Sequence, residues 1–275
     1  MMSGQLGRDF DEISLVYDDT RQPLEPEVIG GLVRFLEDHG WSSVLEVGVG
    51  TGRIAGPLAE RGLMMVGVDA SRGMLSRAAA KGVARLVRAT AFRLPFVDRV
   101  FDVVLFVHVL HMLDDPEAAL REAARVARSG VLALMDHDSV EERAEVRSEP
   151  SPRDLVRQAL ADVGYPDLLR PGPRGKEREI VRRHLPAETR TLSDREVTEP
   201  LARHLDPLEK RAYRHVLKTP REELARAVGL ARAKIGTRLV TYRRSEMVVW
   251  WPDPRQDGMS ERRAGPVLSE RTGGP

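Results

Sequence analysis

Short apolar runs alternate with helix-like stretches through the first half of this sequence, and this alternation restricts the fold more than any other feature. Five runs are predicted to be buried strands, at residues 43–47, 63–68, 84–88, 101–107 and 130–135. Helical spacing of apolar residues is found at 26–39, 53–61, 71–81 and 115–128. Strands that alternate with helices form a mostly parallel sheet with helices on both faces, so the sequence predicts an α/β fold.

The pattern changes after residue 140. Residues 141–186 are rich in charge and interrupted by a Pro/Gly segment at 170–175, which predicts a mainly helical insertion. A strand is expected at 187–193, two or three helices over 194–236, and a final strand at 245–251. We therefore expect a core at 1–140, a lid or substrate insertion at 141–190, C-terminal helices and last strands at 191–251, and a disordered tail at 252–275.

Composition excludes several classes of protein. The 275 residues include no cysteine, which excludes disulfides, thiolate catalysis and cysteine-ligated zinc. No apolar run reaches about 18 residues, so no membrane-spanning helix is expected. The acidic N-terminus lacks the apolar stretch of a secretory signal, and we expect a cytoplasmic protein. Charge is uneven: residues 1–141 hold 15 basic and 21 acidic residues (net −6), and residues 142–275 hold 28 and 21 (net +7).

The chemistry concentrates in the stretch VLEVGVGTG at residues 44–52, where a predicted strand meets a helix. Glycines let the backbone turn sharply and approach a ligand, and free N–H groups at a helix start favour polar or anionic groups. Asp69 ends the next strand, where an acid accepts hydrogen bonds from a ribose. A dinucleotide fingerprint needs glycine where Arg53 stands, and Glu46 would repel a pyrophosphate. A nucleoside with a cationic amine, such as S-adenosyl-L-methionine (SAM), suits these residues better.

At this point the sequence resembles the class I SAM-dependent methyltransferases, of the small-molecule type related to the ubiquinone and menaquinone methylases. The resemblance covers about residues 13–140, and the strand at 245–251 looks like the family's last, antiparallel strand. It rests on five motifs in order: EVGVGTG at 46–52, VGVDAS at 66–71, RLPFVD at 93–98, FDVVLFV at 101–107, and the helix beginning at Asp115. The resemblance implies a Rossmann-like, seven-stranded sheet with a helical lid insertion.

The resemblance also implies roles for individual residues around SAM. The loop residues Gly48, Val49, Gly50 and Gly52 would pass beneath its methionine part. Glu46 would hold the amine, and Asp69 the ribose hydroxyls. The remaining carried-over positions are Ala70 and Met74 beside the adenine, and Val107 on the methyl-transfer side.

Two further regions bear on the cofactor. The family usually has an aspartate that binds the adenine amine, whereas this chain has Thr90, followed by Ala91, whose backbone would then hold the adenine. The N-terminal segment YDDTR resembles one that folds over SAM. In that arrangement Arg21 would pair with the SAM carboxylate and Tyr17 would lie nearby; the alternative is the start of a surface helix.

Methyl transfer needs little acid–base help unless the acceptor must lose a proton. His108 and His111 follow the fourth strand, at the sheet edge where substrates bind in such folds, and are the candidate catalytic bases. A structural role for both histidines is the alternative. Asp136, His137 and Asp138 follow the fifth strand, but adjacent side chains point in different directions, and we expect no metal site.

The sequence therefore predicts a SAM-dependent methyltransferase that moves a methyl group to an oxygen, nitrogen or carbon nucleophile of a small molecule, with S-adenosyl-L-homocysteine as product. One alternative is an enzyme that modifies RNA or protein and docks through the basic second half, although aromatic residues for stacking are few. Another is a SAM-binding protein without catalysis.

Overall fold

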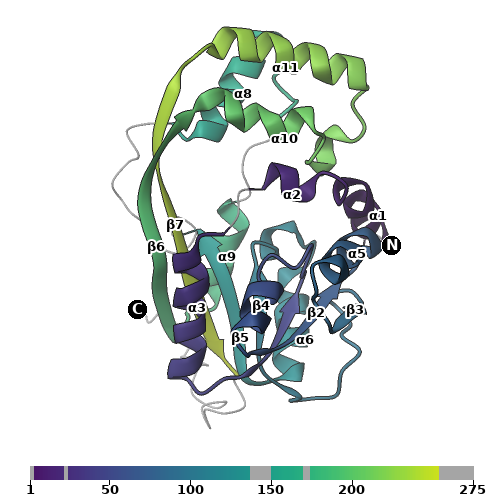
Figure 1. Ribbon diagram of the computed structural model, residues 1–275, viewed down its shortest axis with the longest axis vertical. Coiled ribbons are helices and arrows are strands. Elements are labelled where there is room, and N and C mark those ends of the chain that lie inside the picture. The colour runs from purple at the N-terminus through teal and green to yellow at the C-terminus, as the bar shows by residue number, and fades with distance from the viewer. Residues whose placement is uncertain (1–2, 22–23, 137–149, 170–173, 254–275) are drawn as a thin grey trace, which may run out of the picture.

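The computed structural model describes residues 3–21, 24–136, 150–169 and 174–253, and it contains one seven-stranded sheet (Figure 1). The strand order is β3-β2-β1-β4-β5-β7-β6. The first five strands are parallel, and β7 runs antiparallel to both β5 and β6. The strands are β1 (Ser43–Val47), β2 (Met64–Asp69), β3 (Leu86–Arg88), β4 (Phe101–Val107), β5 (Ala127–Asp136), β6 (Glu188–Pro200) and β7 (Leu239–Pro252). The predicted α/β class is confirmed.

Helices cover both faces of this sheet. Side chains alternate along β4, so Val103 and Leu105 pack with one apolar cluster and Val104 and Phe106 with another. The first cluster includes residues of α3 (Pro26–Asp38), α4 (Ala55–Glu60) and α5 (Arg72–Ala80). The second includes residues of α6 (Pro116–Val126) and α9 (Arg174–Arg183). Burial on both faces explains why the parallel strands are almost wholly apolar.

The predicted helix starts are confirmed. The side chain of Ser71 accepts a hydrogen bond from the backbone N–H of Met74 at the start of α5, and Asp115 accepts one from Ala118 at the start of α6. These N-caps satisfy donors that a helix cannot pair internally. Within the described ranges, no helix is long and apolar enough to cross a membrane.

A separate helical cap is carried on the long β6–β7 ribbon. The described pairing of β7 with β5 ends at Asp136–Glu246, and the pairing of β7 with β6 continues beyond it to Leu239 (Figure 1). A third apolar cluster holds the cap together. The cap consists of α8 (Pro152–Asp162), η2 (Leu201–Leu205), α10 (Asp206–Glu209), η3 (Arg214–Val216) and α11 (Arg221–Ile235). The N-terminal helices α1 (Ser3–Ile13) and α2 (Tyr17–Thr20) lie between the cap and the sheet (Figure 1).

Helices were expected over residues 194–236; the structure has them from Leu201 to Ile235 but not at residues 194–200. Residues 194–200 belong to β6, where Val197 and Thr198 pair with Tyr242 and Thr241 of β7. Pairing with a distant strand has overridden the charged, helix-like local sequence. Residues 141–149 and 170–173 of the predicted insertion and residues 254–275 of the predicted tail lie outside the described residues. The tail prediction is wrong for residues 252 and 253, because Pro252 pairs with Gly130 in the sheet and Asp253 is buried in an ion pair with Arg99. The described helices of that insertion separate, because α8 joins the cap while α9 packs on the sheet.

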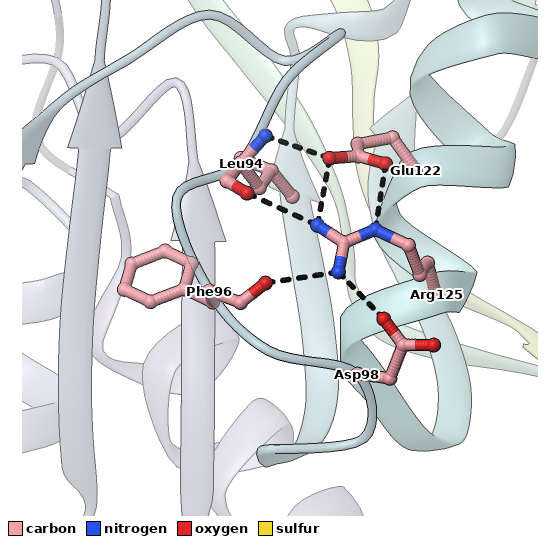
Figure 2. Close-up of polar contacts among 5 residues, drawn as sticks. All are labelled: Leu94, Phe96, Asp98, Glu122 and Arg125. Atoms are coloured by element: carbon pink, nitrogen blue, oxygen red, sulfur yellow. Dashed lines mark hydrogen bonds and ion pairs between the residues drawn. The ribbon is translucent and has the colours of Figure 1, made fainter.

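Arg125 of α6 holds the loop between β3 and β4 (Figure 2). Its guanidinium donates to the backbone carbonyls of Leu94 and Phe96 at 3.0 and 2.9 Å and to Asp98 at 2.7 Å. Glu122 accepts from the same guanidinium and from the backbone N–H of Leu94. The RLPFVD motif at 93–98 therefore has a structural role, which is to fix the loop that follows Thr90 and Ala91.

We expect Arg125→Ala to lower the free energy of unfolding by about 2–3 kcal/mol, because it leaves two part-buried carbonyls and Glu122 without their donor. Urea unfolding measures the change. Arg183→Ala is the matched control, since Arg183 pairs with Glu179 on an exposed helix face and its removal should cost less than about 0.5 kcal/mol. Equal losses in the two variants would contradict the bracing role of Arg125.

Candidate functional site

The glycine loop after β1 has a backbone that only glycine adopts readily. Gly48 and Gly50 have φ of +79° and +55°. The backbone N–H groups of Gly48 and Val49 both donate to the carbonyl of Val68 at the end of β2. A Cβ at Gly48 would lie 2.8 Å from a methyl group of Val109. The loop is therefore fixed between two strand ends, with its backbone open to a cavity.

Two adjoining cavities lie over this loop, and they share Phe10, Tyr17, Gly48, Gly50 and Met112 in their walls. The smaller one brings together many of the predicted cofactor residues: Tyr17, Gly48, Gly50, Asp69, Ala70, Met74, Thr90 and Ala91. The larger one, of about 750 Å³, extends to the cap. Its predicted residues are Arg21, Glu46, Val49, Val107, His108 and His111.

Gly52 lines neither cavity. Its φ is +78°, and a Cβ there would lie 2.7 Å from a methyl group of Val83. Gly52 therefore lies where the loop packs against Ala78 of α5 and against Val83, which follows that helix. Phe10, Phe92, Val109 and Met112 also line the smaller cavity, although sequence reasoning did not point to them.

Glu46 is a buried carboxyl group next to the glycine loop, and its pKa is strongly shifted. Its residue is only 2% exposed, and Oε2 has no hydrogen-bond partner among the described residues. Burial, followed by the nearby carboxylate of Asp69, raises the pKa of Glu46 to about 8, against an opposing hydrogen bond from the backbone of Ala55. A buried carboxyl with an unpaired oxygen is costly, so this position favours a ligand that supplies a cation.

Asp69 is held at the end of β2 by backbone donors. The N–H groups of Gly50 and Ser71 donate to its two carboxylate oxygens at 2.9 and 2.8 Å. Burial raises the pKa of Asp69, and these donors oppose the rise. The two bonds fix the carboxylate beside the loop while each oxygen keeps a further lone pair for a ligand.

Two aspartates that sequence reasoning missed bind the N-terminal helices to the glycine loop and to the start of α5. Asp18 accepts from the hydroxyl of Thr51 at 2.6 Å and pairs with Lys81 at 2.7 Å. Asp11 accepts from the Ser71 hydroxyl at 2.7 Å and from the Gly73 N–H. The run of acids near the N-terminus was the available signal, because acids favour a helix start such as that of α5.

Arg21 lies at the junction of the N-terminal segment and the cap. Its guanidinium carbon is 5.3 Å from the ring centre of Tyr17 and 5.7 Å from that of Tyr213. Its Nε is buried and has no hydrogen-bond partner among the described residues. The cation therefore lines the cavity with donor capacity left for an anionic group.

Both predicted bases line the larger cavity, each beside a glutamate. Nε2 of His108 is 3.1 Å from Oε2 of Glu246, and Nδ1 of His111 is 2.7 Å from Oε1 of Glu177. Burial lowers the pKa of His108, but Glu246 and two more distant acids outweigh it and raise the pKa above its usual value. Asp136 also lines the larger cavity.

No group of three or more histidine and acidic side chains within the described ranges could hold a metal ion. His137 and Asp138 lie outside those ranges.

A second polar group lies where the cap meets the larger cavity. Glu199 accepts from the hydroxyl of Tyr242 at 2.8 Å and lies 3.1 Å from Nε2 of His204. Burial and then the Glu199 hydrogen bond raise the pKa of Tyr242 to about 12. The sequence did not predict this group, because it forms only when the β6–β7 ribbon pairs beyond the sheet.

Comparison with known proteins adds independent information about residues 45–135, which match the family described as a methyltransferase domain. The chain is 39% identical over 127 residues to a demethylmenaquinone methyltransferase of Mycolicibacterium paratuberculosis, covering 45% of this chain and 55% of that protein. It is 31% identical over 140 residues to the uncharacterized methyltransferase YcgJ of Bacillus subtilis, covering 48% and 55%. The chain thus spans about half the length of these relatives.

The similarity of fold extends further than the similarity of sequence. The crystal structure of the YcgJ protein of Bacillus subtilis superimposes with a TM-score of 0.51 at 19% identity, over 82% of this chain and 98% of that one. The strand order and the antiparallel β7 agree with the predicted Rossmann-like fold. Residues 45–135 therefore resemble a methyltransferase domain in sequence, and the described chain shares its fold with a solved structure of the same kind.

Proposed function

We propose that this protein transfers a methyl group from SAM to a small-molecule acceptor. Bound SAM would supply an activated methyl group on a sulfonium, so the protein's contribution is to orient the partners and exclude water. The observation that carries the proposal is the buried, unpaired Oε2 of Glu46 beside the glycine loop, where a cationic amine would satisfy it.

The residues present fit SAM along its whole length. Arg21 has an unpaired donor for the carboxylate, and Glu46 has an unpaired acceptor for the amine. Asp69 is fixed where the ribose hydroxyls would lie, at the end of β2. Ala70, Met74, Thr90 and Ala91 line the smaller cavity and would surround the adenine. Thr90 supplies a hydroxyl in place of the usual carboxylate.

Two observations support a small acceptor over RNA or protein. A cavity of about 750 Å³ lies between sheet, N-terminal helices and cap, which is a typical size for a small-molecule site. Many arginines of the basic second half pair with carboxylates of this chain, which leaves less charge for a phosphate backbone. These pairs include Arg183–Glu179, Arg190–Asp38, Arg214–Asp9, Arg232–Asp206, Arg243–Asp194 and Arg244–Glu25.

The cap would select the acceptor. Arg153, Arg203 and Tyr213 of the cap region line the larger cavity together with residues of the N-terminal segment and the sheet. We propose that residues 1–136 bind the cofactor and that the cap and the β6–β7 ribbon define the acceptor end. This division assigns the lid role to α8 and the helices between β6 and β7.

Calorimetric titration with SAM and with S-adenosyl-L-homocysteine tests the cofactor assignment. Asp69→Ala should weaken SAM binding by about 1–3 kcal/mol, because it removes a charged acceptor for the ribose. Asp102→Ala is the matched control: Asp102 also accepts from two backbone N–H groups, those of Ser42 and Ser43, but lies at the opposite end of the sheet. Absence of SAM binding by the wild-type protein would overturn the proposed function. Unchanged affinity in Asp69→Ala would overturn only the ribose assignment.

A further inference from the structure

Three neighbouring strands carry ionisable side chains at the same edge of the sheet. His108 directly follows β4, Asp136 is the last residue of β5, and Glu246 lies on β7 opposite Asp136. The backbone N–H of His108 donates to the carbonyl of Leu134, which continues the β4–β5 ladder to the histidine. Asp136 and Glu246 are direct partners across the antiparallel β5–β7 pair, so their side chains share one face. Like charges directly opposite destabilise a sheet, and a cation beside them offsets that cost.

The imidazole of His108 is placed to be that cation. Its Nε2 lies 3.1 Å from Oε2 of Glu246, whose side chain is only 10% exposed, whereas the His108 side chain is 38% exposed and lines the larger cavity. Its Nδ1 has no hydrogen-bond partner among the described residues and remains available to a ligand. The backbone of His108 has φ of +50°, a strained conformation for a non-glycine residue that is enriched at functional sites.

His111 is held by a different element of the fold and is less exposed. Its Nδ1 is bonded at 2.7 Å to Glu177 of α9, and its side chain is 20% exposed. That pair joins η1 (Leu110–Met112) to α9, and α9 packs on the sheet. Each candidate base therefore has one ring nitrogen without a partner among the described residues, Nδ1 in His108 and Nε2 in His111. His108 is favoured because its side chain is the more exposed, at 38% against 20%, and because its backbone has the positive φ.

We propose that the acceptor is a hydroxyl compound, that His108 removes its proton through Nδ1, and that Glu246 positions the ring and stabilises the imidazolium. This inference rests on the proposed function and adds the class of acceptor to it. In the transfer step the acceptor oxygen forms a bond to the methyl carbon, and the carbon–sulfur bond breaks with its electron pair left on sulfur. The hydroxyl proton passes to Nδ1 of His108, which becomes a cation, and the positive charge of the sulfonium is lost.

The arrangement of charges favours a hydroxyl over a protonated amine. A neutral hydroxyl creates a new positive charge on His108 as it loses its proton, and the carboxylates of Glu246 and Asp136 stabilise that charge only then. An ammonium acceptor is already positive before the transfer, so the same carboxylates would stabilise the starting state as well and would accelerate the reaction less. The groups that face His108 from surrounding elements are Glu246 of β7, Asp136 of β5 and Glu177 of α9.

Two phenols separate proton removal from other effects. At mildly alkaline pH, 4-nitrophenol is largely ionised and needs no base, whereas 4-methoxyphenol keeps its proton. With each phenol as acceptor probe and isotope-labelled SAM as donor, Glu246→Gln should slow transfer to 4-methoxyphenol by about tenfold or more and transfer to 4-nitrophenol far less. His108→Asn should do the same more strongly, and asparagine tolerates the positive φ at this position.

Glu188→Gln is the matched control, because Glu188 forms a histidine–glutamate pair of the same 3.1 Å length with His39, outside both cavities. This variant should leave both rates unchanged. The pH profile for 4-methoxyphenol gives a second readout: Glu246→Gln lowers the pKa of His108, so the rise in rate should move to lower pH. An NMR titration of the His108 ring follows the same pKa without any acceptor.

Four outcomes would overturn the inference: equal slowing of both phenols, no slowing of either, an unshifted His108 titration in Glu246→Gln, or SAM binding without transfer to either phenol. In each case SAM would still bind, which separates failure of the hydroxyl assignment from failure of the proposed function.

Discussion

Replacing Gly130 with alanine is expected to lower the free energy of unfolding by about 3 kcal/mol or more, among the largest losses for a single methyl group in this chain. Gly130 has φ of +138°, which other residues rarely adopt. A Cβ there would lie 2.2 Å from the carbonyl oxygen of Trp251 and 2.8 Å from Cα of Pro252. These are backbone atoms of the paired strand, so relief requires opening the β5–β7 ladder at Gly130 and Pro252.

Gly229→Ala is the control for this substitution. Gly229 lies inside α11, and a Cβ there would meet no atom within 4 Å, so alanine should stabilise the protein by about 0.5–1 kcal/mol through its helix propensity. Urea unfolding of both variants gives the comparison. A loss below about 1 kcal/mol in Gly130→Ala would show that β5 and β7 can separate locally at little cost. The two strands would then contribute less to stability than their central place in the sheet indicates.

The same sheet shows where sequence reasoning works and where it fails. Strands β1 and β4 lie between two other strands and are covered on both faces, so their sequences are almost wholly apolar and were located from the pattern. Strand β6 is at the sheet edge and carries Glu188, Asp194 and Glu196 among its residues. Its partner β7 supplies the pairing that the local sequence does not show, and residues 194–200 were therefore predicted as helix.

The candidate site divides in the same way. The glycine loop, Glu46 and Asp69 are close in sequence to the strands that carry them, and their spacing is enough to predict them. Glu246 and Glu177 approach His108 and His111 from distant parts of the chain. No local pattern indicates such partners, because the register of β5 with β7 and the packing of α9 decide them.

Glu46→Gln is expected to reduce the pH dependence of stability in the ligand-free protein. Burial raises the pKa of Glu46 from 4.5 to about 8 in the folded state, so the folded protein holds a proton that the unfolded chain releases. The stability gained from that proton is fully present below pH 4.5 and is lost as pH rises to about 8. The wild-type protein should therefore lose a few kcal/mol across this window. Asp69 and His108, whose pKa values are also raised, contribute slopes of the same sign that remain in the variant.

SAM binding should depend on the same carboxyl group in the opposite direction. The amine binds the ionised form of Glu46, so affinity should rise with pH until about 8 and binding near neutral pH should release a proton. Calorimetry in two buffers of different ionisation enthalpy measures that proton. In Glu46→Gln the release should disappear, and affinity should fall by about 1.5–3 kcal/mol through loss of a charged hydrogen bond.

Glu60→Gln is the control for both measurements, because Glu60 is an exposed glutamate at the end of α4 and its carboxyl is hydrated in both states. Its curves of stability and affinity against pH should follow the wild type. If Glu46→Gln kept the wild-type slope of stability, the buried carboxyl would be ionised and compensated by a group other than a ligand. If it kept the wild-type affinity for SAM, Glu46 would not hold the amine. If Glu46→Gln lowers both the pH slope of stability and the affinity for SAM, one carboxyl group is responsible for both. Its burial destabilises the ionised free protein, and the cation of the ligand removes that destabilisation on binding.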